Sequence, residues 1–172
     1  MSQFVMNEKN KLHEVACQVV SLASQLKKII VTAESCTGGL VATSITDIPG
    51  SSCCFSHGVV TYSDAAKNTI LGIDSVFIKD NGAVSKAVAE CMAKKVLRGN
   101  AADISVAITG IAGPTGGSLE KPVGTVWLAW GYYVNNQIIV DTQDYCFNGD
   151  RNTIRFQSAI EALLGLEKRM NK

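Results

Sequence analysis

A serine in one short segment is the residue best suited to attack a substrate. Ser35 lies in the segment 34–39 (ESCTGG), which follows a β-branched run and precedes a short helical pattern. Backbone N–H groups at such a strand-to-helix turn are unpaired and favour negative charge. The serine could attack a carbonyl carbon, and the oxyanion could be held by the amides of Cys36, Thr37, Gly38 and Gly39. The alternative is a helix cap followed by a tight turn.

A lysine is the candidate base. Lys67 falls in the first turns of a helix that Ser63 is expected to cap. The helix dipole disfavours a cation there, and partial burial would move its pKa toward neutrality. Because no histidine is well placed, a Ser–Lys pair is the natural alternative to a Ser–His pair. The competing interpretation is a solvated lysine paired with Asp64.

A glycine-rich loop and an arginine are the candidate anion-binding features. The segment 109–117 (TGIAGPTGG), which begins with Thr109 and Gly110, follows a buried strand, where α/β sheets bind ligands. Its glycines allow a nest of amides around a phosphate or carboxylate. Arg151 opens a helix and opposes its dipole, which a bound anion would explain. The alternatives are an ordinary surface loop and an ion pair with Asp150.

The cysteines indicate neither a metal site nor a disulfide framework. None of the six forms a C-x-x-C pair, and only two histidines accompany them. A domain of 172 residues needs no disulfide, so we expect reduced thiols in a cytoplasmic protein without a cofactor. Cys36 is a rival nucleophile to Ser35, although a small buried core residue is the commoner role.

Composition narrows the possible partners. The chain has 16 Lys and Arg against 15 Asp and Glu, a net charge of +1, so we expect no general electrostatic grip on nucleic acid. The longest uncharged run, 122–140, contains Asn135 and Asn136, which suits a strand–turn–strand better than a membrane span. The low charged fraction, 18%, together with apolar strands, favours a homo-oligomer.

The pattern of apolar residues places these segments on a framework. Helices are expected at 9–27, 40–48, 63–71, 85–98 and 152–168. Strands are expected at 29–33, 55–62 and 103–109, with a hairpin formed by 123–134 and 137–145. This alternation predicts one α/β domain, residues 1–172, folded as a three-layer α/β/α sandwich with a mixed β-sheet.

Five short segments together carry a family resemblance that none carries alone. They are TAESCTGG at 32–39, GVVTYS at 58–63, GAVS at 82–85, TGIAGP at 109–114 and KPVGTV at 121–126. In this order they closely resemble the C-terminal domain of the competence/damage-inducible protein CinA. The resemblance implies a three-layer fold. It also implies hydrolysis of nicotinamide mononucleotide to nicotinic acid mononucleotide and ammonia, in pyridine-nucleotide recycling.

The resemblance also implies roles for single residues. The family's serine nucleophile matches Ser35, its lysine matches Lys67, and its tyrosine matches Tyr62. Ser52, which follows Gly50 and Ser51, is a candidate third polar member. Positions near the bound nucleotide match Thr109, Gly110 and Arg151. The larger family members carry an N-terminal domain of another fold, and its cofactor pyrophosphate chemistry is not expected of this chain.

The expected mechanism begins with a neutral Lys67. It takes the Ser35 proton directly, or through Tyr62 or Ser52, and later protonates the departing ammonia. Glu34 either orients the turn or pairs with Lys67, and a pair would keep the lysine charged.

Two other hypotheses stay open from the sequence. One is a nucleotide-binding regulatory module with a degenerate site, linked to competence or the DNA damage response. The other is a cysteine hydrolase that uses Cys36.

Overall fold

One mixed β-sheet organises the chain. The structure is a computed structural model that describes residues 3–99 and 101–171. Its sheet has five strands in the order β2-β1-β3-β4-β5. Their bounds are β1 Ile30–Glu34, β2 Phe55–Val60, β3 Ile104–Gly110, β4 Thr125–Val134 and β5 Gln137–Cys146. β1 runs parallel to β2 and β3, whereas β4 runs antiparallel to β3 and β5. The predicted mixed sheet is confirmed.

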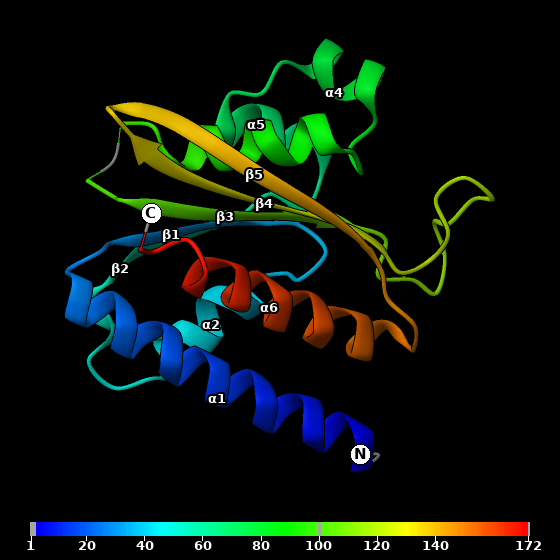
Figure 1. Ribbon diagram of the computed structural model, residues 1–172. Coiled ribbons are helices and arrows are strands. Elements are labelled where there is room, and N and C mark those ends of the chain that lie inside the picture. The colour runs from blue at the N-terminus through cyan, green and yellow to red at the C-terminus, as the bar shows by residue number, and fades with distance from the viewer. Residues whose placement is uncertain (1–2, 100, 172) are drawn as a thin grey trace.

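Helices cover both faces of this sheet and complete three layers (Figure 1). One face packs against α1 (Gln3–Leu26), α2 (Leu40–Thr46) and α6 (Arg151–Glu167), and the other against α3 (Asp64–Leu71), α4 (Ser75–Asn81) and α5 (Lys86–Leu97). Successive residues of β1 alternate between the two cores, Ile30 in the first and Val31 in the second. Because both faces are covered, β1 is buried along its whole length, as its unbroken apolar run predicts.

Local chemistry sets most of the predicted element boundaries. The Ser63 hydroxyl accepts from the Ala66 amide and starts α3, and Gly72 ends it with a φ of 62°. The hairpin between β4 and β5 turns at Asn135 and Asn136, whose φ angles are 50° and 62°. Two successive positive φ values are those of a type I′ turn, which matches the twist of the strands.

Several expected boundaries were wrong by two or more residues, and α4 was not expected. α1 begins at Gln3 instead of residue 9, and β2 ends at Val60, so Tyr62 lies in a loop. α4 is started by Asp74, whose carboxylate accepts from the Val76 amide at 2.7 Å. This helix was not predicted because Ile78 is its one buried side chain, and a single buried residue leaves no apolar periodicity in the sequence. No helix in the described part of the chain is long and apolar enough to cross a membrane.

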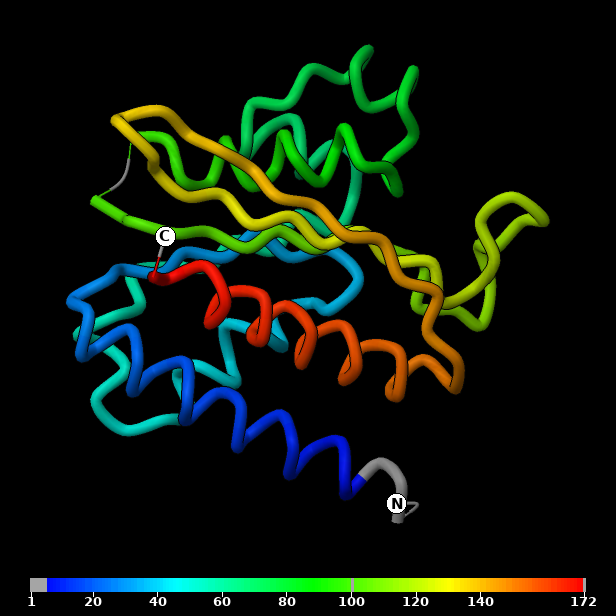
Figure 2. Tube along the Cα trace, in the orientation of Figure 1, coloured from blue at the N-terminus to red at the C-terminus, as the bar shows by residue number. Residues whose placement is uncertain are grey.

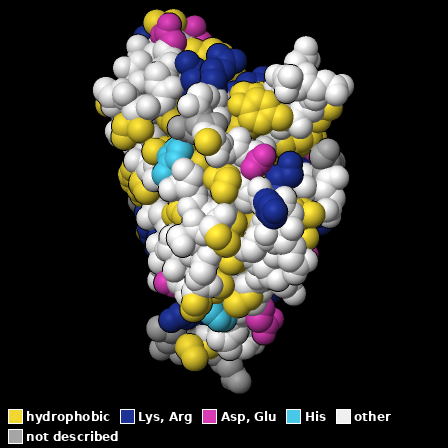
Figure 3. All heavy atoms as spheres, turned by 90° about the vertical axis from the view of Figure 1, so that its left-hand side faces the viewer, with side chains coloured by type: hydrophobic (Ala, Val, Ile, Leu, Met, Phe, Trp, Pro, Cys, Tyr) yellow, Lys and Arg dark blue, Asp and Glu magenta, His cyan; other side chains and the backbone are white. Residues whose placement is uncertain are grey.

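The loops that follow β1 and β3 and the start of α6 gather at one end of the sheet. The carboxyl ends of β1 and β3, the start of α6 and the projecting loop 111–124 lie together at the right-hand edge in both ribbon and tube views (Figures 1 and 2). The opposite end faces the viewer in Figure 3, where basic side chains form small groups separated by uncharged, acidic and hydrophobic surface. Because α/β sheets bind ligands outside the carboxyl ends of their strands, we expect a ligand site at the edge with the projecting loop.

Candidate active site

Backbone hydrogen bonds fix Ser35 at the carboxyl end of β1. The Ser35 amide donates to the Ile108 carbonyl at 3.0 Å, and the Gly38 amide donates to the Ser35 carbonyl at 3.0 Å. Gly38 and Gly39 have φ values of 62° and 90°, a region that other residues rarely adopt. The two glycines let the chain reverse sharply from β1 into α2, and this reversal presents the serine side chain at the edge of the sheet.

Lys67 reaches Ser35 from the start of α3. Its Nζ donates to Ser35 Oγ at 3.4 Å and to the Thr61 carbonyl at 3.1 Å. The lysine is 1% exposed and the serine 7%. Burial lowers the pKa of Lys67, against the opposing effects of Asp64 and Cys36. Two segments far apart in the sequence thus bring an amine with a lowered pKa next to a hydroxyl, at the slightly long separation that catalytic pairs often have before a substrate binds.

Glu34 orients the turn. Its carboxylate is fully buried and accepts from the amides of Ala42 at 2.8 Å and Val41 at 3.1 Å, at the start of α2. The described residues contain no ion pair between Glu34 and Lys67. Of the two roles left open by the sequence, the structure therefore supports the first, and α2 begins on a carboxylate of the protein itself.

Cys36 is a poor nucleophile in this setting. Burial, with a smaller contribution from Glu34, raises the pKa of its thiol to about 12, although its own amide, that of Thr37 and Arg155 act in the opposite direction. At neutral pH the thiol keeps its proton, and a thiol is far less nucleophilic than a thiolate. The protonated thiol of Cys36, together with the contact between Lys67 and Ser35, favours Ser35 as the nucleophile.

A cavity of about 310 Å³ opens beside Ser35. It is lined by Ser35, Cys36, Tyr62, Gly110, Ile111, Ala112, Gly113, Thr115, Gly116 and Arg151. These residues come from the turns after β1 and β2, from the last residue of β3 and the loop after it, and from the first residue of α6. The size lies in the range of small-molecule sites.

Arg151 spans one side of this cavity. Its Nη1 donates to the Gly113 carbonyl at 2.7 Å and its Nη2 to Tyr62 Oη at 2.6 Å. The described residues place no carboxylate within ion-pair distance of Arg151. Asp150, its expected alternative partner, instead accepts from the Thr153 amide and caps α6, and this hydrogen bond lowers the pKa of Asp150. A positive charge without an acidic partner thus borders the cavity.

Several residues expected to bind substrate do not reach the cavity. Thr109 is 1% exposed, and its hydroxyl donates to the Ala83 carbonyl. Thr37 is fully buried, and its carbonyl accepts from Arg155. Gly38 and Gly39 shape the turn and are not among the residues that line the cavity. These four therefore hold the backbone in place, whereas Gly110 and Cys36 do line the cavity.

Ser52 lies far from the pair within one copy of the chain. It is exposed in the short 3-10 helix Ser51–Cys53, which precedes β2. β1 and β2 are parallel, with Ile30 paired to Phe55 and Glu34 to Val60. Ser52 therefore sits at the amino edge of the sheet and Ser35 at the carboxyl edge, so the structure does not bring them together.

Arg155 lies beside the Ser35 turn and was not singled out from the sequence. It follows Arg151 by one helical turn, and its Nε and Nη2 donate to the Thr37 carbonyl at 3.2 and 2.7 Å. The i, i+4 spacing of two arginines was visible in the sequence and could have signalled a shared face. Its carbonyl partner, 118 residues away, could not have been read from the sequence.

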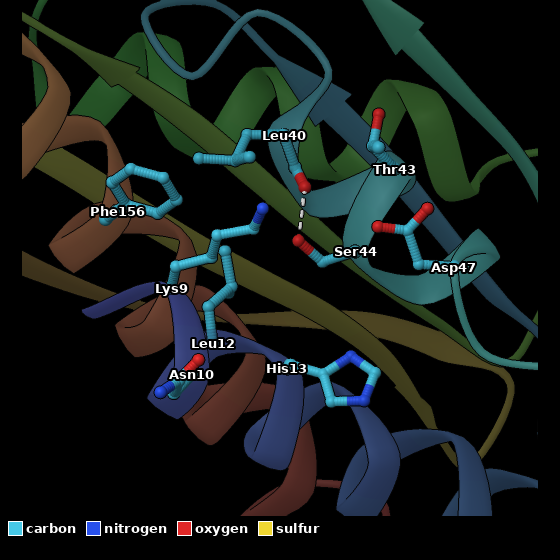
Figure 4. Close-up of a pocket in the computed structure, with 9 residues that line it drawn as sticks. All are labelled: Lys9, Asn10, Leu12, His13, Leu40, Thr43, Ser44, Asp47 and Phe156. Atoms are coloured by element: carbon cyan, nitrogen blue, oxygen red, sulfur yellow. Dashed lines mark hydrogen bonds between the residues drawn. The ribbon is translucent and has the colours of Figure 1, made fainter. Parts of the chain in front are cut away.

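A second cavity, of about 220 Å³, lies between α1, α2 and α6 (Figure 4). Leu12, Leu40 and Phe156 give it an apolar wall, and the hydrogen bond drawn there, from Ser44 Oγ to the Leu40 carbonyl, is internal to α2. It holds no paired nucleophile and base. The part of the chain that is described also contains no cluster of three or more His, Cys, Asp or Glu that could hold a metal. The Ser35 cavity is the candidate active site.

Comparisons with known proteins agree on one family. The family model described as the CinA C-terminal domain matches residues 12–170. The chain is 44% identical over 158 residues to the nicotinamide-nucleotide amidohydrolase PncC of Enterobacter agglomerans, covering 92% of this chain and 94% of that protein. The PncC of Escherichia coli K12 is 45% identical over 154 residues, 90% of this chain and 92% of that protein. A CinA-like protein of Chlorobaculum tepidum is 47% identical, but the chain spans only 37% of its length.

Solved structures extend the likeness to the fold. The competence damage-inducible protein A of Klebsiella pneumoniae superposes with a TM-score of 0.86 at 34% identity, covering 93% of this chain and 97% of that one. The competence/damage inducible protein of Agrobacterium tumefaciens gives a TM-score of 0.86 at 38% identity, covering 94% and 96%. The chain belongs to the CinA C-terminal domain family.

Proposed function

We propose that this protein hydrolyses the carboxamide of nicotinamide mononucleotide, giving nicotinic acid mononucleotide and ammonia, as a step of pyridine-nucleotide recycling. The observation that carries the proposal is the 3.4 Å approach of Lys67 Nζ to Ser35 Oγ beside a cavity. Relatives of nearly the same length are named nicotinamide-nucleotide amidohydrolases, which supports this choice of substrate.

The chemistry assigned to the pair is acyl transfer. Neutral Lys67 accepts the Ser35 proton while Oγ attacks the carboxamide carbon, and a tetrahedral intermediate forms. The C–N bond then breaks, and the lysine ammonium returns the proton to the departing nitrogen, which leaves as ammonia. Water attacks the resulting Ser35 ester with Lys67 again acting as base, which releases the carboxylate product and restores the hydroxyl.

Lys67 performs these proton transfers without a relay. Its Nζ already contacts Ser35 Oγ directly, and Tyr62 is 57% exposed with its hydroxyl held by Arg151. Ser52 lies at the other edge of the sheet and is given no role within the same chain. Tyr62 is instead assigned to the wall of the cavity, where it supports the guanidinium.

Arg151 is assigned to the phosphate of the substrate. A guanidinium without an acidic partner, at the rim of the cavity, matches the fork geometry of a phosphate. Binding that is equally strong in the ground and transition states appears in KM alone. We therefore expect Arg151→Ala to raise KM with little change in kcat, and an unchanged KM would remove the phosphate role.

The test of the function is ammonia release from nicotinamide mononucleotide by the purified wild-type protein. Turnover supports the proposal. A calorimetric binding signal without product would instead favour the nucleotide-binding regulatory module.

Three expectations stay predictions: residence in the cytoplasm, absence of direct nucleic-acid binding, and assembly as a homo-oligomer. Sedimentation checks the oligomer, for which the exposed side chains of Ile70 and Val76 offer apolar surface.

A further inference from the structure

We propose that Arg155 is a positioning residue: it holds the turn that carries Ser35, so that the serine hydroxyl stays within reach of Lys67. The proposal rests on the function given above, because positioning is judged by the reaction of Ser35. It extends that function to a side chain that does not line the cavity.

The hydrogen bonds of Arg155 are concentrated on one atom. Its Nε and Nη2 both donate to the Thr37 carbonyl, at 3.2 and 2.7 Å. Thr37 lies two residues after Ser35 and just before Gly38, in the turn between β1 and α2. Two donors from one rigid guanidinium fix both the distance and the plane of the carbonyl, which a single flexible donor cannot do.

The charge of Arg155 is directed at the same turn. The described residues place no carboxylate within ion-pair distance of this arginine. The positive charge of Arg155 acts on Cys36, the neighbour of Ser35. It favours a lower pKa of the Cys36 thiol, against the larger effect of burial. The arginine is thus not part of a surface ion pair, and both its charge and its donors act on the segment that carries the nucleophile.

The helix α6, which carries Arg155, is held in place by contacts that do not involve the guanidinium. Ile154, Ala159 and Ile160 of α6 are buried in the core, and the neighbouring Phe156 packs against it from the side drawn in Figure 4. Because these contacts hold α6, removal of the guanidinium is expected to release the turn without displacing the helix. A variant at Arg155 should therefore fold.

The two arginines of α6 then have separable effects. Arg151 borders the cavity and Arg155 does not. Loss of Arg151 should weaken substrate binding, whereas loss of Arg155 should leave binding in place and misplace the nucleophile. A displacement of about 1 Å in an active site can cost 10²-fold in rate.

The experiment compares Arg155→Met, Arg155→Lys and the control Lys168→Met, which removes an exposed charge near the end of the same helix. For Arg155→Met we expect kcat to fall by about tenfold to 100-fold while KM stays within about twofold. Arg155→Lys should recover part of kcat, since it keeps the charge and a donor, and Lys168→Met should match wild type. Melting temperatures identify any variant that has lost its fold.

A second readout does not depend on the substrate. An aryl fluorophosphonate reacts with activated serines, and its labelling of Ser35, followed by peptide mass spectrometry, should slow in Arg155→Met in step with kcat. An unchanged kcat and labelling rate in the folded variant would overturn the proposal, as would a raised KM with unchanged kcat. If wild type releases no ammonia, the proposed substrate fails, while the labelling rates still decide the role of Arg155.

Discussion

Asp64 offers a quantitative test of Lys67 as a base. Its Oδ1 lies 3.8 Å from Lys67 Nζ, and the aspartate side chain is 66% exposed whereas that of the lysine is 2% exposed. Ion pairs between two exposed side chains contribute about 0.2–1 kcal/mol, and we place this pair in the upper half of that range because its lysine is buried. A free energy of about 0.5–1 kcal/mol corresponds to a factor of roughly two to five in the equilibrium between the charged and the neutral amine.

The sign follows from which form of Lys67 is active. Asp64 favours the charged amine and so opposes the lowering of its pKa by burial; Cys36 is the other titratable group that acts on it. Replacing Asp64 by Asn removes that support, and the pKa of Lys67 falls further. Because the neutral amine is the base, the rising limb of kcat/KM should move to lower pH, and kcat/KM on that limb should increase by about twofold to fivefold.

The assay is the pH profile of kcat/KM for ammonia release by wild type and Asp64→Asn. Asp80→Asn is the matched control, since Asp80 is exposed on α4 and its limb should not move. A limb that moves to higher pH in Asp64→Asn, or that stays in place as it does in the control, would refute Lys67 as the group whose neutral form is required.

Three further predictions concern stability and reactivity. Lys67→Met should abolish turnover yet raise the melting temperature. Because the pKa of the lysine is lowered in the folded state, the wild type loses stability as the pH falls through that folded-state pKa. Calorimetry should therefore find a larger gain in melting temperature for Lys67→Met at lower pH, and a melting temperature below that of wild type would contradict this. Glu34→Ala should cost about 1–3 kcal/mol in urea unfolding, because two amides of α2 lose their acceptor; an unchanged midpoint would contradict the cap. Iodoacetamide at pH 8 should label exposed Cys17 and Cys53 but spare Cys36, as peptide mapping would report, and rapid labelling of Cys36 would show that its thiol is not held protonated.

The chemistry of turns explains why much of the fold could be predicted. Ser63 and Gly72 bound α3 as their residue types indicate, and Asn135 with Asn136 makes the hairpin turn. Each depends on contacts within a few residues, which the sequence displays. α4 was missed because it buries too little apolar surface to leave a period in the sequence.

Side-chain direction explains why parts of the site could not be predicted. Thr109 was expected to face the ligand, yet its hydroxyl turns to the Ala83 carbonyl, 26 residues away. Glu34 had two open roles, and only the position of α2 decides between them. Ser52 matched a family position, but the parallel register of β1 and β2 puts it at the other edge of the sheet. In each case long-range packing sets the contact.

In the proposed mechanism the Ser35 hydroxyl, activated by Lys67, is the nucleophile. The most direct measurement is ammonia release at saturating nicotinamide mononucleotide by wild type and Ser35→Ala, with circular dichroism to show that both are folded. Loss of a nucleophile typically costs 10³-fold or more in kcat, and we expect a fall of about that size. A folded Ser35→Ala protein that releases ammonia at a rate close to that of wild type would contradict it.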